Sequence, residues 1–166
     1  MKFNIIVAMD KHRGIGLNNN LPWYFKEDMT YFKNLTKGAG NNAIVMGKNT
    51  YKSINKALPF RDNIVLSSSL QDLPDQFLLC KSIEELMNLV DEKNYDEVWI
   101  IGGSNIYKQF IYMFEYINKI FITHIDSSYN CDTFFPELPE NYTLETSSIT
   151  SEKYTLLNFQ RYINLK

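Results

Sequence analysis

The sequence predicts an α/β protein with a mixed, mostly parallel central sheet, flanked by helices and completed by a C-terminal antiparallel hairpin. Two patterns lead to this fold class. Short, nearly continuous apolar runs alternate with segments of helical periodicity along most of the chain. Strands joined through helices form βαβ units with parallel strands. The last two strand-like segments have no helix between them, so we expect them to pair antiparallel at one edge of the sheet.

The predicted strands are short and rich in β-branched and aromatic residues, which is typical of strands buried on both faces. They cover residues 3–9, 42–47, 63–68, 77–80, 97–103 and 119–126. The tail, residues 142–163, is interpreted as two further strands joined by a polar turn near residues 150–153. A polar, glycine-containing loop, residues 10–20, follows the first strand.

The predicted helices cover residues 25–35, 48–54, 82–93 and 104–114. In the first helix, Phe25, Met29 and Phe32 fall on one stripe, which we expect to be buried. The third helix has the clearest start. Ser82 is an N-cap candidate, and Glu85 three residues later completes a capping box.

Length and composition limit the function classes. The 166 residues suit one domain, residues 1–166, and an apolar fraction of 45% with 22% charged residues excludes a disordered chain. The formal net charge of −2 gives no basic excess, which argues against nucleic acid or an anionic membrane surface as partner. The apolar run at residues 3–9 is too short for a signal peptide or a membrane span, so we expect a cytoplasmic protein.

The cysteines and histidines do not form a metal-binding pattern. Cys80 and Cys131 lack C-x-x-C spacing, and their distances from His12 and His124 in the sequence do not fit a zinc site, so no metal is expected. Two free thiols in a reducing cytosol are expected, while a single disulfide between the two cysteines stays open at this point.

Small, hydroxyl or basic residues follow four of the predicted strands. They are Gly102-Gly103-Ser104, Gly47-Lys48-Asn49-Thr50, Ser67-Ser68-Ser69 and Lys81. In an open α/β sheet, ligands bind beyond the carboxyl ends of the strands. The pattern therefore indicates a long polyanionic ligand such as a dinucleotide, although G-x-G-x-x-G is absent. Each end also has a simpler explanation, a tight strand–helix connection for the glycines and a solvated side chain for Lys48.

Asp28 is the most informative single residue. It lies three residues after Phe25 and four before Phe32, so it shares their helix stripe. A carboxylate among aromatic side chains is desolvated and has a raised pKa, which is typical of functional sites. The alternative is an exposed aspartate that interacts with the helix dipole.

Two neighbouring motifs allow similar pairs of interpretations. Trp23 is either a core aromatic or a residue whose indole N–H holds a water near Asp28. Arg61 is either a surface charge or a bidentate partner for a ligand carboxylate.

Taken together, these motifs resemble the dihydrofolate reductase family, in its bacterial type, over almost the whole chain. The segments that carry the resemblance are IVAMDKHRGIGLNNNLPWYFKEDMTYFK, IVMGKNTYKSI, LPFRDNIVLSS, EVWIIGGSNIY, ITHID and CDTFFP. The most specific features are LPW with an acid five residues after Trp23, M-G-(K/R)-x-T, and I-G-G-x-x-(I/V)-Y.

The resemblance implies reduction of 7,8-dihydrofolate to tetrahydrofolate by NADPH, in support of one-carbon metabolism and thymidylate synthesis. Asp28 would bind the pterin and help protonate N5 through water, Thr123 would support Asp28, and Trp23 would order the water. Ala8, Phe32, Ile54 and Leu58 would line the pterin and benzoyl pocket, and Arg61 would bind the glutamate α-carboxylate. Antifolates would inhibit the enzyme, which is expected to be a monomer.

The resemblance also assigns residues to the cofactor. Gly102 and Gly103 match a pair that is usually joined by a cis peptide bond in the family, and Asp132 matches an acid that in some members binds the closed nicotinamide loop. The residues implied in NADPH binding are Ala8, Ile15, Gly16, Leu17, Gly47, Lys48, Asn49, Thr50, Leu66, Ser67, Ser68, Lys81, Ile101, Gly102, Gly103, Ser104, Asn105, Ile106 and Tyr107.

Some positions depart from the family pattern. Ser104 replaces a common third glycine, Asn105 a basic residue, and Lys48 the usual arginine, which weakens the argument for NADPH over NADH. Ala57 and Phe60 replace a frequent proline and glycine, which leaves the shape of that loop open.

Two other functions are compatible with parts of this pattern. One is a reductase of the same fold that acts on a pyrimidine riboside, which Asp28, Phe32 and Arg61 disfavour. The other is a catalytically inactive nucleotide-binding protein, which the presence of Asp28, Trp23 and Thr123 disfavours.

Overall fold

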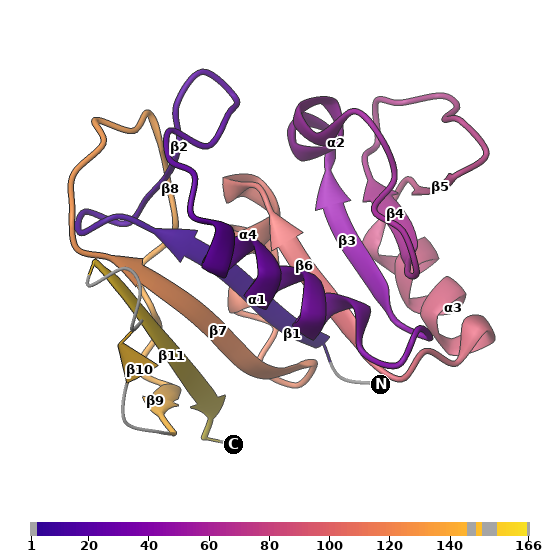
Figure 1. Ribbon diagram of the computed structural model, residues 1–166. Coiled ribbons are helices and arrows are strands. Elements are labelled where there is room, and N and C mark those ends of the chain that lie inside the picture. The colour runs from indigo at the N-terminus through magenta and orange to yellow at the C-terminus, as the bar shows by residue number, and fades with distance from the viewer. Residues whose placement is uncertain (1–2, 146–148, 151–155, 166) are drawn as a thin grey trace.

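The computed structural model describes residues 3–145, 149–150 and 156–165. Figure 1 shows a twisted central sheet with helices on both of its faces. The helices are α1 (Lys26–Lys37), α2 (Lys48–Ile54), α3 (Ile83–Lys93) and α4 (Ser104–Ile111). The strands are β1 (Phe3–Met9), β2 (Gly14–Gly16), β3 (Ala43–Gly47), β4 (Asp62–Leu66), β5 (Phe77–Cys80), β6 (Val98–Gly102), β7 (Ile117–Ile125), β8 (Thr133–Phe134), β9 (Tyr142–Leu144), β10 (Ile149–Thr150) and β11 (Leu157–Asn164).

The main sheet is mixed and mostly parallel, as predicted. Its strand order is β10-β11-β7-β1-β6-β3-β4-β5, and β9 also pairs with β11. Six adjacent strands run parallel to one another, in the order β7, β1, β6, β3, β4 and β5. Strand β11 pairs antiparallel with β7, β9 and β10, so the expected C-terminal antiparallel pairing is confirmed.

Two apolar layers hold the helices to the sheet. On one face, Phe110 and Ile111 of α4 and Leu86 of α3 pack against alternate residues of the parallel strands, such as Ile5 and Ile100. On the other face, side chains from α1 and α2 pack against the intervening strand residues, among them Ile44, Met46 and Trp99. This alternation follows from the period of two along a strand.

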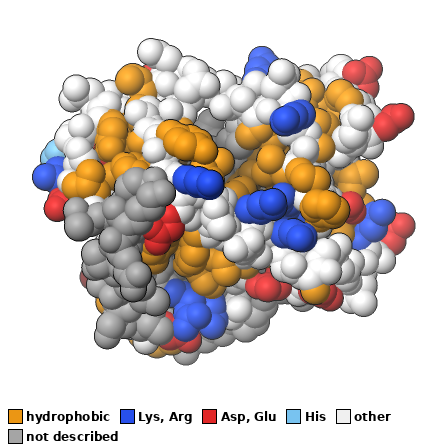
Figure 2. Space-filling model, in the orientation of Figure 1, with side chains coloured by type: hydrophobic (Ala, Val, Ile, Leu, Met, Phe, Trp, Pro, Cys, Tyr) orange, Lys and Arg blue, Asp and Glu red, His pale blue; other side chains and the backbone are white. Residues whose placement is uncertain are grey.

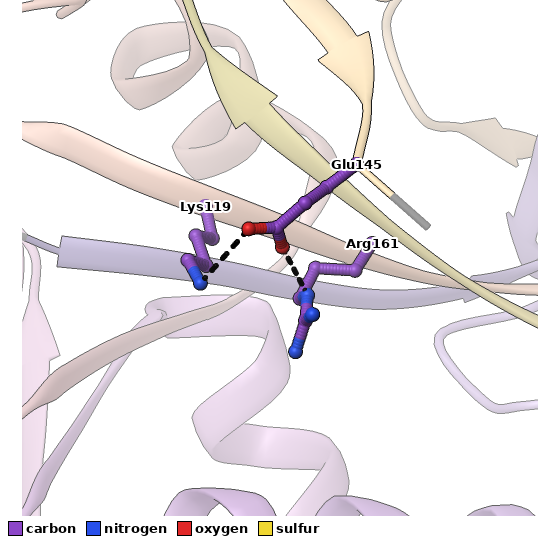
Figure 3. A network of polar contacts seen from close by, with 3 residues as sticks. All are labelled: Lys119, Glu145 and Arg161. Carbon is purple, nitrogen blue, oxygen red and sulfur yellow. Dashed lines mark hydrogen bonds and ion pairs between the residues drawn. The ribbon is translucent and has the colours of Figure 1, made fainter. Parts of the chain in front are cut away.

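A small charged network joins the C-terminal strands. Glu145, just after β9, forms ion pairs with Lys119 of β7 at 3.5 Å and with Arg161 of β11 (Figure 3). The side chains are only partly exposed, and Glu145 also donates its backbone N–H to the Arg161 carbonyl at 2.9 Å. The network therefore links three strands that are distant in the sequence.

Several predicted boundaries need correction. Strand β4 ends at Leu66 rather than residue 68, because Ser69 donates its N–H to the Ser67 hydroxyl at 3.4 Å, a local bond that competes with the sheet ladder. Helix α4 ends at Ile111 rather than residue 114, where Met113 N bonds Phe110 O at 2.9 Å in a tighter turn. The tail holds three strands, and most of the turn predicted at residues 150–153 lies outside the described residues.

The buried stripe of α1 is rotated relative to the prediction. Phe25 is the N-cap residue, and Met29 is 44% exposed, whereas Phe32 and Leu35 pack against the sheet. The cap of α3 forms as predicted. The Ser82 hydroxyl accepts from Glu85 N at 3.1 Å, and the Glu85 carboxylate accepts from Lys81 N at 2.7 Å.

The structure has neither a disulfide between its two cysteines nor, among the described residues, a membrane-spanning helix. Cys80 and Cys131 are both free, so the disulfide left open by the sequence does not form. Within the described ranges, none of the helices is both long and apolar enough to span a membrane.

Candidate functional site

A deep cleft opens where the carboxyl ends of the parallel strands meet. Its volume is ≈ 1090 Å³, and its walls include Ala8 of β1, Gly47 of β3, Leu66 of β4, Ile101 of β6 and Thr123 of β7. Figure 2 shows hydrophobic and basic side chains gathered around the centre of this face. The position is the one expected for ligands of an open α/β sheet, and the volume suits two sizeable ligands side by side.

The cleft brings together nearly all the residues singled out from the sequence. Of the proposed substrate residues, it is lined by Ala8, Asp28, Phe32, Ile54, Leu58, Arg61 and Thr123. Of the proposed cofactor residues, it is lined by Ala8, Ile15, Gly16, Gly47, Lys48, Asn49, Thr50, Leu66, Ser67, Ser68, Lys81, Ile101, Gly103, Ser104, Asn105, Ile106 and Tyr107. Trp23, Leu17 and Gly102 do not line it.

Asp28 places a carboxyl group at the apolar end of the cleft. Burial raises the pKa of Asp28 above its ordinary value, a hydrogen bond from the Thr123 hydroxyl opposes this shift, and the charge of Glu27 adds to it. Thr123 is itself 2% exposed, so this partner is fixed in the sheet. The exposed-aspartate interpretation of the sequence is therefore wrong.

Trp23 lies in the core next to this end rather than in the cleft wall. It is 9% exposed and packs against Tyr129, with ring centroids 5.1 Å apart. Its indole N–H is buried and has no hydrogen-bond partner among the described residues. A buried donor of this kind needs a polar partner such as a water, which fits the water-binding interpretation.

Arg61 is held in place at the rim by two hydrogen bonds. Its Nη1 donates to the Thr36 hydroxyl at 2.8 Å, and its Nε donates to the Pro59 carbonyl at 2.8 Å. Thr36 in turn donates to the Phe32 carbonyl at 2.8 Å, which ties the arrangement to α1. These bonds orient the guanidinium toward the cleft and leave its other N–H groups for a ligand carboxylate.

The other end of the cleft gathers cations and hydroxyl groups. Lys48 Nζ donates to the Ser69 hydroxyl at 3.3 Å, and the Ser69 hydroxyl lies 3.3 Å from that of Ser67. Lys81 Nζ bonds Gln71 Oε1 at 3.2 Å and lines the same cleft. Ammonium and hydroxyl donors in this combination suit phosphate groups.

Between the two ends, β6 meets α4 at the Gly102–Gly103 peptide bond, which is cis. Gly102 has φ +114°, and a Cβ there would lie 3.0 Å from the Tyr107 ring. Tyr107 cannot easily move, because its buried hydroxyl donates to the Ile6 carbonyl at 2.8 Å. Glycine at this position allows α4 to approach the sheet closely.

The loop after β1 is closed against a distant segment. Strand β2 pairs antiparallel with β8, and Asn18 N donates to the Asp132 carboxylate at 3.0 Å. At the base of the loop, Asp10 is 2% exposed and accepts from the backbone N–H groups of His12, Gly14 and Tyr129 at 2.9, 2.7 and 3.1 Å. The pairing holds Ile15 and Gly16 in the cleft wall.

Comparison with known proteins identifies the family. The sequence matches the family described as Dihydrofolate reductase over residues 2–163. It is 39% identical over 152 residues to dihydrofolate reductase of Drosophila melanogaster, covering 86% of this chain and 83% of that protein. It is 41% identical over 139 residues to that of Staphylococcus haemolyticus, covering 82% and 77%, and 36% identical over 147 residues to that of Bacillus subtilis, covering 87% and 82%.

The chain belongs to the dihydrofolate reductase family. It is accordingly an oxidoreductase, and members of this family use a nicotinamide cofactor. The mixed, mostly parallel α/β fold predicted from the sequence is confirmed and agrees with this family.

The residues that depart from the family pattern lie at or near the cleft. Phe60 stands where a glycine is frequent, and its backbone has φ +66°, a conformation that favours glycine. Ser104 and Asn105 begin α4 and line the cleft. Lys48, where an arginine is usual, lies at the hydroxyl-rich end and donates a hydrogen bond to the Ser69 hydroxyl.

Sequence reasoning missed one wall of the cleft. Lys26, Met29, Thr30 and Lys33 line it from α1. Their spacing of three, four and seven residues is the period of a helix face, so a second face of α1 could have been recognised once the first was assigned. Leu21 and Tyr24, from the loop before α1, carried no comparable signal.

Proposed function

We propose that this protein reduces 7,8-dihydrofolate to 5,6,7,8-tetrahydrofolate with NADPH, as a single-domain monomer that antifolates inhibit. The observation that carries the proposal is one continuous cleft with a half-buried carboxyl group, Asp28, at its apolar end and the Lys48, Ser67 and Ser69 cluster at the other. This tetrahydrofolate would support one-carbon metabolism and thymidylate synthesis.

At the apolar end, Asp28 would accept hydrogen bonds from the pterin amino group and N3. Its raised pKa keeps a proton available closer to neutral pH than an exposed aspartate would. The proton reaches N5 through a water, for which the unpartnered indole N–H of Trp23 is the nearby donor candidate. Thr123 holds the carboxyl group in position.

The middle of the cleft suits the flat part of the substrate. Ala8, Phe32, Ile54 and Leu58 supply apolar wall on the side of α1 and α2, which excludes water from the pterin and benzoyl rings. Arg61, fixed by Thr36 and Pro59, would bind the α-carboxylate of the glutamate tail. Binding energy from the tail then helps to orient the pterin for reaction.

The remaining residues fit the nicotinamide dinucleotide. When bound, the cofactor supplies the hydride that is added to C6 of the substrate, while the proton from Asp28 and its water is added to N5. Lys48, Ser67 and Ser68, with Lys81, offer charge and hydroxyl donors for the pyrophosphate and the adenosine 2′-phosphate. A phosphate-bearing dinucleotide therefore fits this donor set better than one without the 2′-phosphate.

The test is a turnover measurement with purified protein. Loss of the reduced-nicotinamide absorbance is followed with dihydrofolate and NADPH, with an antifolate control and a parallel series with NADH. We expect antifolate-sensitive oxidation with a lower KM for NADPH than for NADH. Equal KM values would contradict the role given to Lys48 and Ser68. Folded protein that binds NADPH without oxidising it would contradict the reaction.

A further inference from the structure

Phe60 is an exposed aromatic residue in a strained backbone conformation. Its φ is +66°, a region that bulky side chains rarely adopt, and its side chain is 65% exposed. Such a conformation costs free energy that a glycine would not lose. Because the ring is largely outside the core, burial does not compensate for this cost. A contact at the surface has to offset it instead.

The ring lies beneath a lysine from the end of α1. Lys37 Nζ is 4.9 Å from the Phe60 ring centroid, a cation–π distance. One residue along each segment, Arg61 donates to Thr36 at 2.8 Å. Two adjacent contacts thus join the last turn of α1 to the loop before β4, the loop that carries Arg61.

This rim carries more positive charge than one carboxylate requires. Lys33, one turn before Lys37, lines the cleft, whereas Lys37 and Phe60 themselves lie outside its wall. None of the ion pairs between described residues includes Lys33, Lys37 or Arg61. A glutamate tail has two carboxylates separated by the α-carbon and two methylene groups, and Arg61 accounts for the first.

We propose that Lys37 and Phe60 form an outer subsite that binds the second, γ-carboxylate of the substrate's glutamate tail. The Phe60 ring holds the Lys37 ammonium at the rim instead of leaving it free in solvent, and the strained backbone of Phe60 is retained for this contact. This inference rests on the proposed reduction of dihydrofolate and adds a determinant of tail recognition to it.

The test compares two substrates that differ only in this group. They are dihydrofolate and its γ-carboxamide, in which the γ-carboxylate is replaced by a neutral amide. The wild-type protein should have a KM about three-fold lower for dihydrofolate, within the range of a partly exposed charge pair. The Lys37→Gln variant should bring the ratio of the two KM values close to one.

Lys93→Gln is the matched control. Lys93 is also a last-turn lysine, but it belongs to α3, which packs on the opposite face of the sheet from α1. This variant loses the same charge at the same helix position, so the KM ratio should stay at the wild-type value. A ratio that Lys37→Gln leaves unchanged, or that both variants reduce equally, would overturn the subsite.

Phe60→Gly separates binding from folding. Glycine adopts the positive φ without strain, so the melting temperature should be equal to or higher than that of the wild type. The KM ratio should nevertheless fall toward one. A lower melting temperature, with both KM values raised equally, would mean that Phe60 only supports the loop and would overturn the proposal.

Absence of the reaction and absence of the outer subsite give different results in this test. If neither substrate is reduced, the proposed reaction is wrong. If wild-type protein reduces both substrates with equal KM values, the reaction stands and only the outer subsite is refuted.

Discussion

The replacement of Gly102 by alanine tests the close approach of α4 to the end of β6. Gly102 has φ +114°, and an added Cβ would lie 3.0 Å from one ring atom of Tyr107 and 3.1 Å from two other atoms of that side chain. The hydroxyl of Tyr107 is fixed to the Ile6 carbonyl at 2.8 Å. The added methyl group therefore meets a side chain that cannot rotate away, and α4 has to move.

Two terms set the size of the effect. The strained backbone costs about 1–3 kcal/mol for a residue with a side chain, and forcing a methyl group into a packed site costs about 1–3 kcal/mol more. Gly40→Ala is the matched control. Gly40 has φ +102°, and a Cβ there would have no heavy atom within 4 Å, so only the backbone cost applies.

The assay is denaturant unfolding of both variants, together with the KM for NADPH. Gly102→Ala should lower the free energy of unfolding by about 1–3 kcal/mol more than Gly40→Ala, a further ~2–4 °C in melting temperature for each kcal/mol in a chain of this size. It should also raise the KM for NADPH, because Ser104 and Tyr107 would move with α4. Equal losses of stability in the two variants would refute the close-approach argument.

Two further predictions concern buried polar groups. Tyr107→Phe removes the buried hydrogen bond from its hydroxyl to the Ile6 carbonyl, so thermal unfolding should show a loss of about 0.5–1.5 kcal/mol; an unchanged melting temperature would contradict this. Asp28→Asn should be more stable than the wild type at neutral pH. The pKa of Asp28 is raised above 3.8 in the folded state. Between the unfolded-state and folded-state pKa values, the folded state therefore holds more protons than the unfolded state. The wild type consequently loses stability as the pH rises through this range. Unfolding measured from acidic to neutral pH should show the difference growing with pH, whereas a constant difference would contradict the role of burial.

Much of the fold could be predicted because its determinants are local. The apolar run of β1 marks a buried strand by its composition alone, and the Ser82 hydroxyl caps α3 through Glu85, only three residues away. The convergence of four strand ends on one cleft followed from the rule that parallel strands share an edge.

What could not be predicted depends on pairings between distant residues. Strand β2 has three residues and forms only because β8 lies beside it. The same holds for Asp10, whose partner Tyr129 is 119 residues away, and for the contact between Lys37 and Phe60. No local periodicity marks such contacts, since each depends on how the whole chain folds.

The measurement that tests the account most directly is the turnover of Asp28→Asn at neutral pH, with NADPH binding measured in the same preparation. Asparagine keeps the size of the side chain and removes its ionisable group, while Lys48 and the serine cluster are untouched. We predict that kcat falls by about 10²–10⁴-fold, the usual range for loss of a general acid, and that the Kd for NADPH changes little. Wild-type turnover in this variant would contradict the catalytic role of Asp28.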